Sequence, residues 1–377
     1  MVNKKRLISL TQRLLRIKSE NPPGEEYEIA MEVKKELGSL GLEVKTYSFL
    51  EKRPNVVGIL KAESARCSLL LTPHLDTVPA GGGWKYNPYS AKIIKGKIYG
   101  RGATDCKGNL SSCLEAIRSL VEDGIKLNYN LIFAATADEE ASSKYGIIPL
   151  LKRILLRPDF ALILDASSFD IIVAQKGLIH FKINISGKKA HGAYPWLGVN
   201  AIEIASRIIN DLKRLKFKYK AHKLLRGPTI NIGTIVGGDK VNMVADFCEF
   251  SVDLRFLPGM SRDKILKEIK NIILRYAGKF KIEIESMQDP YEINKDNPLV
   301  RGLIKAAKNI KAKSRLKGSE GATVITFFKK MNIPAIATGF GAKGTSHATD
   351  EYARIDDLYR GARVLVEFLK NFNNACI

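Results

Sequence analysis

The first 165 residues alternate between segments with helical periodicity and short, mostly apolar runs, and this alternation constrains the fold more than any other feature. The helical segments are residues 4–18, 25–40 and 109–121, and the apolar runs are residues 68–72, 131–136 and 160–164. Apolar runs of this length are typical of strands that are covered on both faces of a sheet. The sequence therefore predicts an α/β fold with a mixed, mostly parallel sheet flanked by helices.

The pattern changes after about residue 178. The next segments have the periodicities of strand, helix, strand, strand, helix and strand, at residues 178–185, 200–215, 229–236, 247–256, 262–276 and 280–285. This order is that of a ferredoxin-like α+β domain. The first pattern then returns, with helices at 298–310, 322–330 and 355–372 and a strand at 333–338. We therefore predict one domain formed by residues 1–177 and 288–377, interrupted by an inserted domain at 178–287.

The formal charge is +22, from 61 lysines and arginines against 39 aspartates and glutamates. Such a charge permits binding of nucleic acid or small anions, but it is also typical of a lysine-rich solvated surface. The basic residues are spread along the chain, with only short clusters such as Lys213–Lys223, and the sequence has no helix-turn-helix or zinc-finger spacing. We therefore expect a surface that steers anionic substrates, and we do not expect nucleic acid as a partner.

Membrane insertion and secretion are not expected either. The sequence has no run of 18 apolar residues, and its basic, amphipathic start lacks the apolar stretch and cleavage site of a secretory signal. The five cysteines, Cys67, Cys106, Cys113, Cys248 and Cys376, are scattered without paired spacing. This usage favours a reducing cytoplasm over a disulfide framework.

Histidines and carboxylates gather directly after the predicted strands. The segments are His74–Asp76, the turn with Asp105, Asp138–Glu140, Asp165 and, after a glycine-rich loop, His347–Glu351. Side chains at the carboxyl ends of the strands of an open α/β sheet line one crevice, so these groups can converge. Clustered carboxylates are costly to bury unless a cation compensates their charge. Imidazole and carboxylate groups together suit zinc and similar ions, so the sequence predicts a metal site.

The chain resembles a known enzyme family in four motifs that are specific in combination. They are HLDTVP at 74–79, Gly-x-x-Asp-x-Lys-Gly at 102–108, DEE at 138–140 and His-x-x-Asp-Glu at 347–351. The resemblance begins at Asn21-Pro22-Pro23-Gly24 and covers almost the whole chain. The family is that of the co-catalytic zinc metallopeptidases and deacylases, which includes carboxypeptidase G, aminoacylase, succinyl-diaminopimelate desuccinylase and acetylornithine deacetylase.

The resemblance implies a role for each residue of these motifs. One metal would be held by His74, Asp105 and Asp165, and the other by Asp105, Glu140 and His347, so that Asp105 bridges two Zn²⁺ ions per subunit, with Co²⁺ or Mn²⁺ as alternatives. Asp76 would orient His74, and Glu139 would be the general base. Two metals that share a water lower its pKa, which suits hydrolysis of an amide bond without a covalent intermediate.

The inserted domain carries three candidate substrate-binding residues by the same resemblance. The segment Gly187–Gly192 looks like the family's dimerisation segment, in which a histidine, here His191, reaches the active site of the partner subunit. Asn242 and Arg255 resemble the residues that bind the substrate carboxylate, for which a guanidinium is suited. The alternatives are an ordinary loop residue for His191, and a partner of Asp253 or a solvated strand residue for Arg255.

We predict a homodimeric cytoplasmic enzyme of amino-acid metabolism. Its substrates would be N-acyl amino acids of the acetylornithine or succinyl-diaminopimelate type. Carboxypeptidase, dipeptidase and aminopeptidase activities stay open as alternatives. An acid as short as Asp165 is commoner in the aminopeptidase and dipeptidase branches of the family. Glu320 stands in the loop where many relatives carry a Gly-Thr-Asp-like signature beside the substrate. A basic binding protein without catalysis is a remote alternative, and a Cys106 nucleophile has little support.

Overall fold

Four parallel strands form the centre of the main sheet and confirm the predicted mixed, mostly parallel α/β fold. In order across the sheet, the strands are β1 (Glu43–Ser48), β2 (Pro54–Leu60), β6 (Asn130–Ala135), β3 (Ser68–Thr72), β7 (Phe160–Ile163), β15 (Ala335–Thr338), β8 (Asp170–Gln175) and β13 (Tyr291–Glu292), while β14 (Arg315–Ser319) pairs with β8 off this path. The parallel strands are β6, β3, β7 and β15, and antiparallel strands extend the sheet on both sides. Strands β1, β2 and β8 were not predicted; β1 is polar and largely exposed and so has no apolar run, whereas β2 and β8 are mostly buried.

Helices cover the strands of this sheet. They are α1 (Lys4–Arg16), α2 (Tyr27–Gly38), α3 (Lys107–Glu122), α4 (Ile147–Lys152), α7 (Pro298–Asn309), α8 (Ile325–Lys330) and α9 (Ile355–Phe372). Leu69 and Leu71 of β3 share one core with residues of α1, α2, α3, α7 and α9, whereas Leu70 points to the opposite face. All three leucines are fully buried, so β3 is covered on both faces as its apolar run predicts.

Two smaller features complete this part of the fold. A three-stranded sheet is formed by β16 (Tyr352–Arg354), β5 (Lys97–Tyr99) and β4 (Lys92–Ile94). Helix α8 begins at Ile325, three residues later than the predicted helix. The reason is that Thr323 donates hydrogen bonds from its backbone N–H and its hydroxyl to Oε1 of Gln175, which holds this residue outside the helix.

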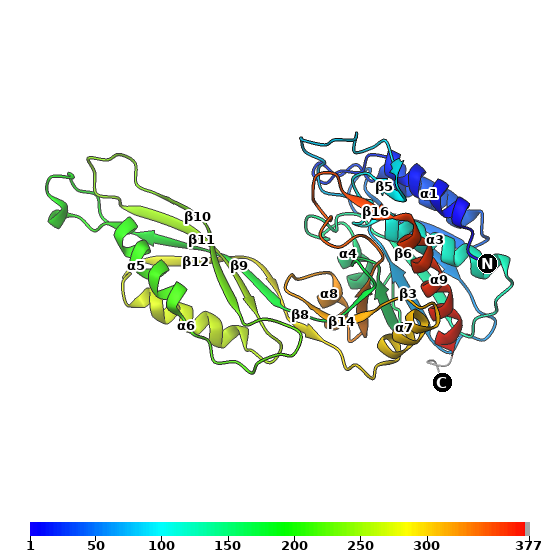
Figure 1. The fold of residues 1–377 in the computed structure, drawn as a ribbon. Helices are drawn as coiled ribbons and strands as arrows, with labels where there is room; N and C mark the ends of the chain where they lie inside the picture. The colour runs from blue at the N-terminus through cyan, green and yellow to red at the C-terminus, as the bar shows by residue number, and fades with distance from the viewer. Residues whose placement is uncertain (374–377) are drawn as a thin grey trace. The chain divides into compact units, whose positions relative to one another are not determined.

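The computed structural model describes residues 1–373, which form two compact units (Figure 1). The first unit contains residues 1–173, 293–317 and the segment from 327 onwards. The second unit contains residues 174–292 and the short segment 318–326. No helix among the described residues is long and apolar enough to span a membrane.

The second unit has the predicted ferredoxin-like order. Its elements are β9 (Gly177–Ser186), the short helix η1 (Pro195–Leu197), α5 (Ala201–Arg214), β10 (Thr229–Gly237), β11 (Phe247–Phe256), α6 (Arg262–Leu274) and β12 (Phe280–Gln288). The strands form one antiparallel sheet in the order β10-β11-β9-β12, and α5 and α6 pack on one of its faces (Figure 1). Phe181 and Ile183 of β9 are buried under these helices, whereas Lys182 between them lies on the polar face.

The cysteines are not all free thiols. Cys106, Cys113 and Cys248 are free and buried, but Cys67 is disulfide-bonded. A disulfide framework is still absent from the described residues, because three of their four cysteines are unpaired.

Candidate metal centre

Three parallel strands end at one edge of the main sheet and supply most of the candidate residues. His74 follows β3, the segment Asp138–Glu140 follows β6, and Asp165 follows β7. A parallel bridge between His74 and Thr136 continues the alignment of β3 and β6 up to the site. Asp105 belongs to the turn immediately before α3, and His347 lies on the loop between β15 and β16.

Asp105 lies between two histidines. Its Oδ1 atom is 3.0 Å from Nε2 of His74, and its Oδ2 atom is 3.3 Å from Nε2 of His347. Nε2 of His74 is 4.0 Å from Oδ1 of Asp165, and Nε2 of His347 is 3.0 Å from Oε2 of Glu140. These contacts define two groups, His74–Asp105–Asp165 and Asp105–Glu140–His347. The structure therefore brings all five predicted ligands together, with one oxygen of Asp105 turned toward each group.

The charges in this cluster perturb one another strongly. Burial, together with the negative charge of Asp105, raises the pKa of Asp165 to about 7. Burial and the charge of Asp165 also raise the pKa of Glu139 well above its usual range. Hydrogen bonds to Asp105 and Glu140 raise the pKa of His347 to about 10. The raised pKa values of the two carboxyl groups and of the histidine all indicate an excess of buried negative charge. A bound cation would compensate this charge.

The donor atoms fit divalent transition metals. Each group offers one imidazole nitrogen and two carboxylate oxygens, and within each group these atoms lie within 4.8 Å of one another. This mixture of nitrogen and oxygen ligands is used by zinc and by similar ions. The shared Asp105 would allow two ions to be held side by side.

Asp76 supports both His74 and the turn that carries Glu139 and Glu140. Its Oδ1 atom lies 3.5 Å from Nδ1 of His74, and Nδ1 is also 3.0 Å from the backbone oxygen of Asp76. The same carboxylate accepts the backbone N–H groups of Glu139 and Glu140 at 3.1 and 3.0 Å. Asp76 is fully buried, so it can orient a ligand histidine and hold the proposed base in place.

A buried charge network that the sequence did not reveal lies behind this turn. Asn21 donates to Oδ2 of Asp76 at 2.9 Å and to Oδ1 of Asp138 at 3.2 Å. Arg53 forms buried ion pairs with Glu26 and, at 3.2 Å, with Asp138. The only sequence signal was that Asn21 begins the Asn-Pro-Pro-Gly motif, whereas Arg53 and Glu26 matched no motif.

Cys106 does not have the properties of a nucleophile. Its side chain is fully buried, and burial raises the pKa of the thiol to about 12. Sγ instead accepts the backbone N–H of His74 at 3.1 Å and donates to the backbone oxygen of the same residue at 3.3 Å. Cys106 therefore helps to fix the segment that carries His74 and remains protonated.

Two glycines let the chain after β15 reach the site. A Cβ atom on Gly339 would lie 1.8 Å from the carbonyl oxygen of Ala166, and one on Gly341 would lie 2.4 Å from the side chain of Thr104. Only glycine permits these close approaches to the neighbours of Asp165 and Asp105. The loop then presents His347, which has a positive φ of 62°, an uncommon conformation that is concentrated at functional sites.

The buried ion pair of Arg101 and Glu351 joins the loops of Asp105 and His347. Glu351 accepts the backbone N–H groups of Gly102, Thr104 and Asp105 at 2.8 to 3.0 Å, and Arg101 donates to it at 2.8 Å. Arg101 also donates to the backbone oxygen of Ala348 at 3.3 Å. Both side chains are almost fully buried. Glu351 was predicted only as part of a motif, and its position explains why an acid is needed there.

The candidate residues of the second unit fall into two separate places. His191 is exposed and accepts the N–H of Ala193, and its neighbour Gly192 donates to the backbone oxygen of Asn242 at 2.8 Å. Arg255 lies at the opposite end of β11, which begins at Phe247. A rise of about 3.3 Å per residue puts Arg255 roughly 25 Å from Phe247, and Asn242 lies on the loop before Phe247. The structure therefore groups His191 with Asn242 and does not bring Arg255 to them.

Two charged residues of this unit already have partners. Arg255 makes a two-pronged ion pair with Asp253, from Nε at 2.6 Å and Nη2 at 2.9 Å. Glu320 lies 2.5 Å from Nζ of the buried Lys176 and accepts the N–H of Arg226 at 2.9 Å. The charge of Glu320 is thus compensated within its own unit, although its side chain is half exposed.

Known proteins resemble this chain over most of its length. Residues 70–371 match peptidase family M20/M25/M40. An uncharacterized metallohydrolase of Methanocaldococcus jannaschii is 31% identical, with 96% of this chain and 98% of the relative covered. An acetylornithine deacetylase of Vibrio cholerae is 29% identical over 89% of both chains. The crystal structure of a tripeptidase from Staphylococcus aureus superposes with a TM-score of 0.81, at 26% identity over 99% of this chain and 100% of the other. The chain therefore belongs to peptidase family M20/M25/M40 and is a metal-dependent hydrolase.

Proposed function

We propose that the protein is a dinuclear zinc amidohydrolase that releases the acyl group of N-acyl amino acids, with acetylornithine-type and succinyl-diaminopimelate-type compounds as leading substrates. The observation that carries this proposal is the position of Asp105 between His74 and His347, with one carboxylate oxygen toward each. The complete set of five ligands, with Glu139 beside them, disfavours a binding protein without catalysis. Co²⁺ and Mn²⁺ are the alternative ions, since the same ligands suit them.

The chain's own residues account for the proton transfers. Two bound cations would polarise the scissile carbonyl and make a water acidic enough to attack at neutral pH. Glu139 would accept the proton of that water as the new C–O bond forms. It would then deliver the proton to the amine nitrogen as the C–N bond breaks. Asp76 keeps Glu139 in place through the backbone N–H of that residue.

Deacylation is preferred because a relative of nearly full coverage is an acetylornithine deacetylase. Peptidase activity is the second candidate, since the tripeptidase from Staphylococcus aureus is 26% identical over almost the whole chain. Asp165, the shorter of the two acids found at this position, also favours the peptidase branch. Arg255 is our proposed ligand for the substrate carboxylate, although Asp253 holds it in this structure.

A substrate screen tests this function. Protein loaded with Zn²⁺ is assayed against acetyl, succinyl and formyl amino acids, and against dipeptides and tripeptides. We expect the highest kcat/KM for an N-acetyl or N-succinyl diamino acid, with loss of activity on chelation and recovery when Zn²⁺ or Co²⁺ is restored. Higher kcat/KM for free peptides than for every acyl amino acid would establish the peptidase instead. Absence of both metal and hydrolysis would eliminate the enzyme.

We further propose a homodimer in which the second unit of each subunit serves two active sites. His191 and Asn242 lie too far from Arg255 for one small substrate to touch all three within one chain. The residues beside His191 form an exposed apolar segment, in which Tyr194, Trp196 and Leu197 are 53, 73 and 58% exposed. Strand β10 is an edge strand of its sheet, and Ile235 and Val236 at its end are also exposed. Exposed apolar surface of this kind is typical of an interface.

Mixed dimers test the arrangement. An inactive His191→Ala subunit is combined with an inactive Glu139→Ala subunit, and mixed dimers are isolated with two affinity tags. We expect activity to return in the mixture to roughly a quarter to a half of the wild-type value, because one of the two sites then has both residues intact. Confirmed mixed dimers that stay inactive would show that His191 does not act across the interface.

A cytoplasmic location is likewise our proposal. Three free, buried cysteines support it. The disulfide-bonded Cys67 counts against it, since disulfides are rare in reducing compartments.

A further inference from the structure

The basic segment at residues 213–223 carries charge that the metal centre does not explain. It contains six lysines and arginines, namely Lys213, Arg214, Lys216, Lys218, Lys220 and Lys223, and the sequence has no aspartate or glutamate between positions 212 and 238. None of these six side chains forms an ion pair within residues 1–373. The neighbouring acid Asp211 is already bound by Tyr276 and Arg275. The segment is therefore a local surplus of positive charge.

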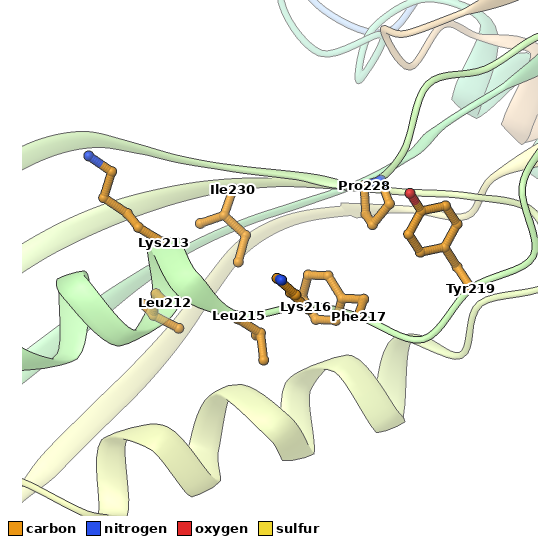
Figure 2. Close-up of a pocket in the computed structure, with 8 residues that line it drawn as sticks. All are labelled: Leu212, Lys213, Leu215, Lys216, Phe217, Tyr219, Pro228 and Ile230. Carbon is orange, nitrogen blue, oxygen red and sulfur yellow. The ribbon is translucent and has the colours of Figure 1, made fainter.

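Apolar side chains alternate with the lysines of this segment and line a cavity. From Leu215 to Lys220 the sequence is Leu-Lys-Phe-Lys-Tyr-Lys. The cavity has a volume of about 460 Å³ and lies between this segment and β10. Figure 2 shows Phe217 between Leu215 and Tyr219, with Ile230 and Pro228 on the β10 side of the hollow. Lys213 and Lys216 are exposed and belong to the same lining.

Glycine at position 227 makes room for the ring of Tyr219. A Cβ atom on Gly227 would lie 2.5 Å from the phenol oxygen and 3.1 Å from Cζ of this tyrosine. Tyr219 is 47% exposed, and its phenol oxygen lies close to the backbone of Gly227. The ring of Tyr219 thus lines one end of the cavity, while Lys213, another lining residue, extends its nitrogen away from the aromatic residues in Figure 2.

We propose that this cavity binds a nucleoside phosphate. Its volume lies in the range of about 300–1,000 Å³ that is usual for small-molecule sites. Aromatic side chains stack on nucleobases, and lysines bind phosphate as point charges. Two unpaired lysines that line it, Lys213 and Lys216, suit a multiply charged phosphate better than a single carboxylate. The limited volume favours one nucleotide over a nucleic-acid strand, which needs a groove that follows several phosphates. This proposal does not depend on the reaction at the metal centre.

Calorimetric titration of the full-length protein tests the site with three probes, ATP, AMP and inorganic pyrophosphate, at one fixed salt concentration. We expect ATP to saturate one site per chain in the second unit with a Kd of about 10⁻⁴ M or lower. The double variant Lys213→Glu/Lys216→Glu should weaken ATP binding by at least about tenfold, because it replaces two attractive charges with repulsive ones. The matched control is Lys34→Glu/Lys35→Glu on the exposed face of α2, which changes the net charge equally and should alter Kd by less than about twofold.

Variants of Tyr219 separate ring stacking from charge. Tyr219→Ala should weaken ATP and AMP but leave pyrophosphate unchanged, whereas Tyr219→Phe should retain wild-type affinity. No saturable binding of ATP up to about 1 mM would overturn the proposal. Equal weakening by the control pair would also overturn it, because the binding would then follow net charge alone. An oligothymidylate that binds more than about tenfold tighter than ATP would assign the segment to single-stranded nucleic acid instead.

Discussion

Replacing Glu139 with alanine should remove almost all hydrolysis while both metals stay bound. Glu139 contributes no atom to either donor group, so its loss leaves the metal ligands intact. Its pKa is raised by burial and by the charge of Asp165 in the metal-free chain, which shows that it lies within the electrostatic reach of the site. Loss of a general base typically costs about 10²–10⁴-fold in rate. We therefore expect kcat to fall by about that factor with little change in KM.

The measurements are kcat from the released amine and metal content by mass spectrometry. Glu28→Ala, at an exposed position of α2, is the control for removing a carboxylate, and it should leave both values unchanged. A Glu139→Ala protein whose kcat stays within about threefold of wild type would exclude this residue as the base. A protein that loses its metals would instead make Glu139 a ligand or a support of one.

Replacing Asp105 with alanine should empty both metal positions, whereas His347→Ala should empty one. Asp105 is the one residue common to both donor groups, and His347 belongs to the second group alone. Alanine at 105 also removes the negative charge that separates His74 from His347. We expect about two metals per chain in the wild type, about one after His347→Ala and close to none after Asp105→Ala. Activity should fall by at least about 10³-fold after Asp105→Ala.

Metal content after dialysis against a weak chelator decides this prediction. Asp263→Ala on α6, where the side chain is 87% exposed, is the control for removing an aspartate. Equal metal content in the Asp105→Ala and His347→Ala proteins would contradict a shared ligand. In that case each ion would be held by a separate set of residues.

Local sequence patterns predicted many, but not all, of the parts of the fold that bury continuous or alternating apolar residues, since β2 and β8 were not predicted. The run at 68–72 becomes the fully buried β3, and the alternation at 178–185 becomes the part of β9 that faces α5 and α6. The pattern did not reveal β1, whose residues are mostly polar and exposed. It also placed the start of α8 too early, because hydrogen bonds from Thr323 to Gln175, which is distant in sequence, hold Thr323 outside the helix.

In the metal centre, too, local patterns predicted some residues and contacts between distant residues decided the others. Histidine and carboxylate groups at strand ends, together with the family resemblance, are sufficient to predict His74, Asp76, Asp105, Glu139, Glu140, Asp165 and His347 from the sequence. The supports of these residues do not appear in any local pattern. Arg101 and Glu351 are 250 positions apart, and Asn21 is 117 positions from Asp138.

The sequence by itself determined the class of fold, most of its helices and the chemical groups at the ends of the central strands, because periodicity and strand-end chemistry are properties of neighbouring residues. The resemblance implied a shared Asp105, but only the tertiary structure gave the contacts of its two carboxylate oxygens with His74 and His347 and placed Arg255 at the end of β11 away from His191. It also decided that the basic segment at 213–223 borders a cavity. These features depend on the distance between side chains that folding brings together, and a single sequence does not contain such distances.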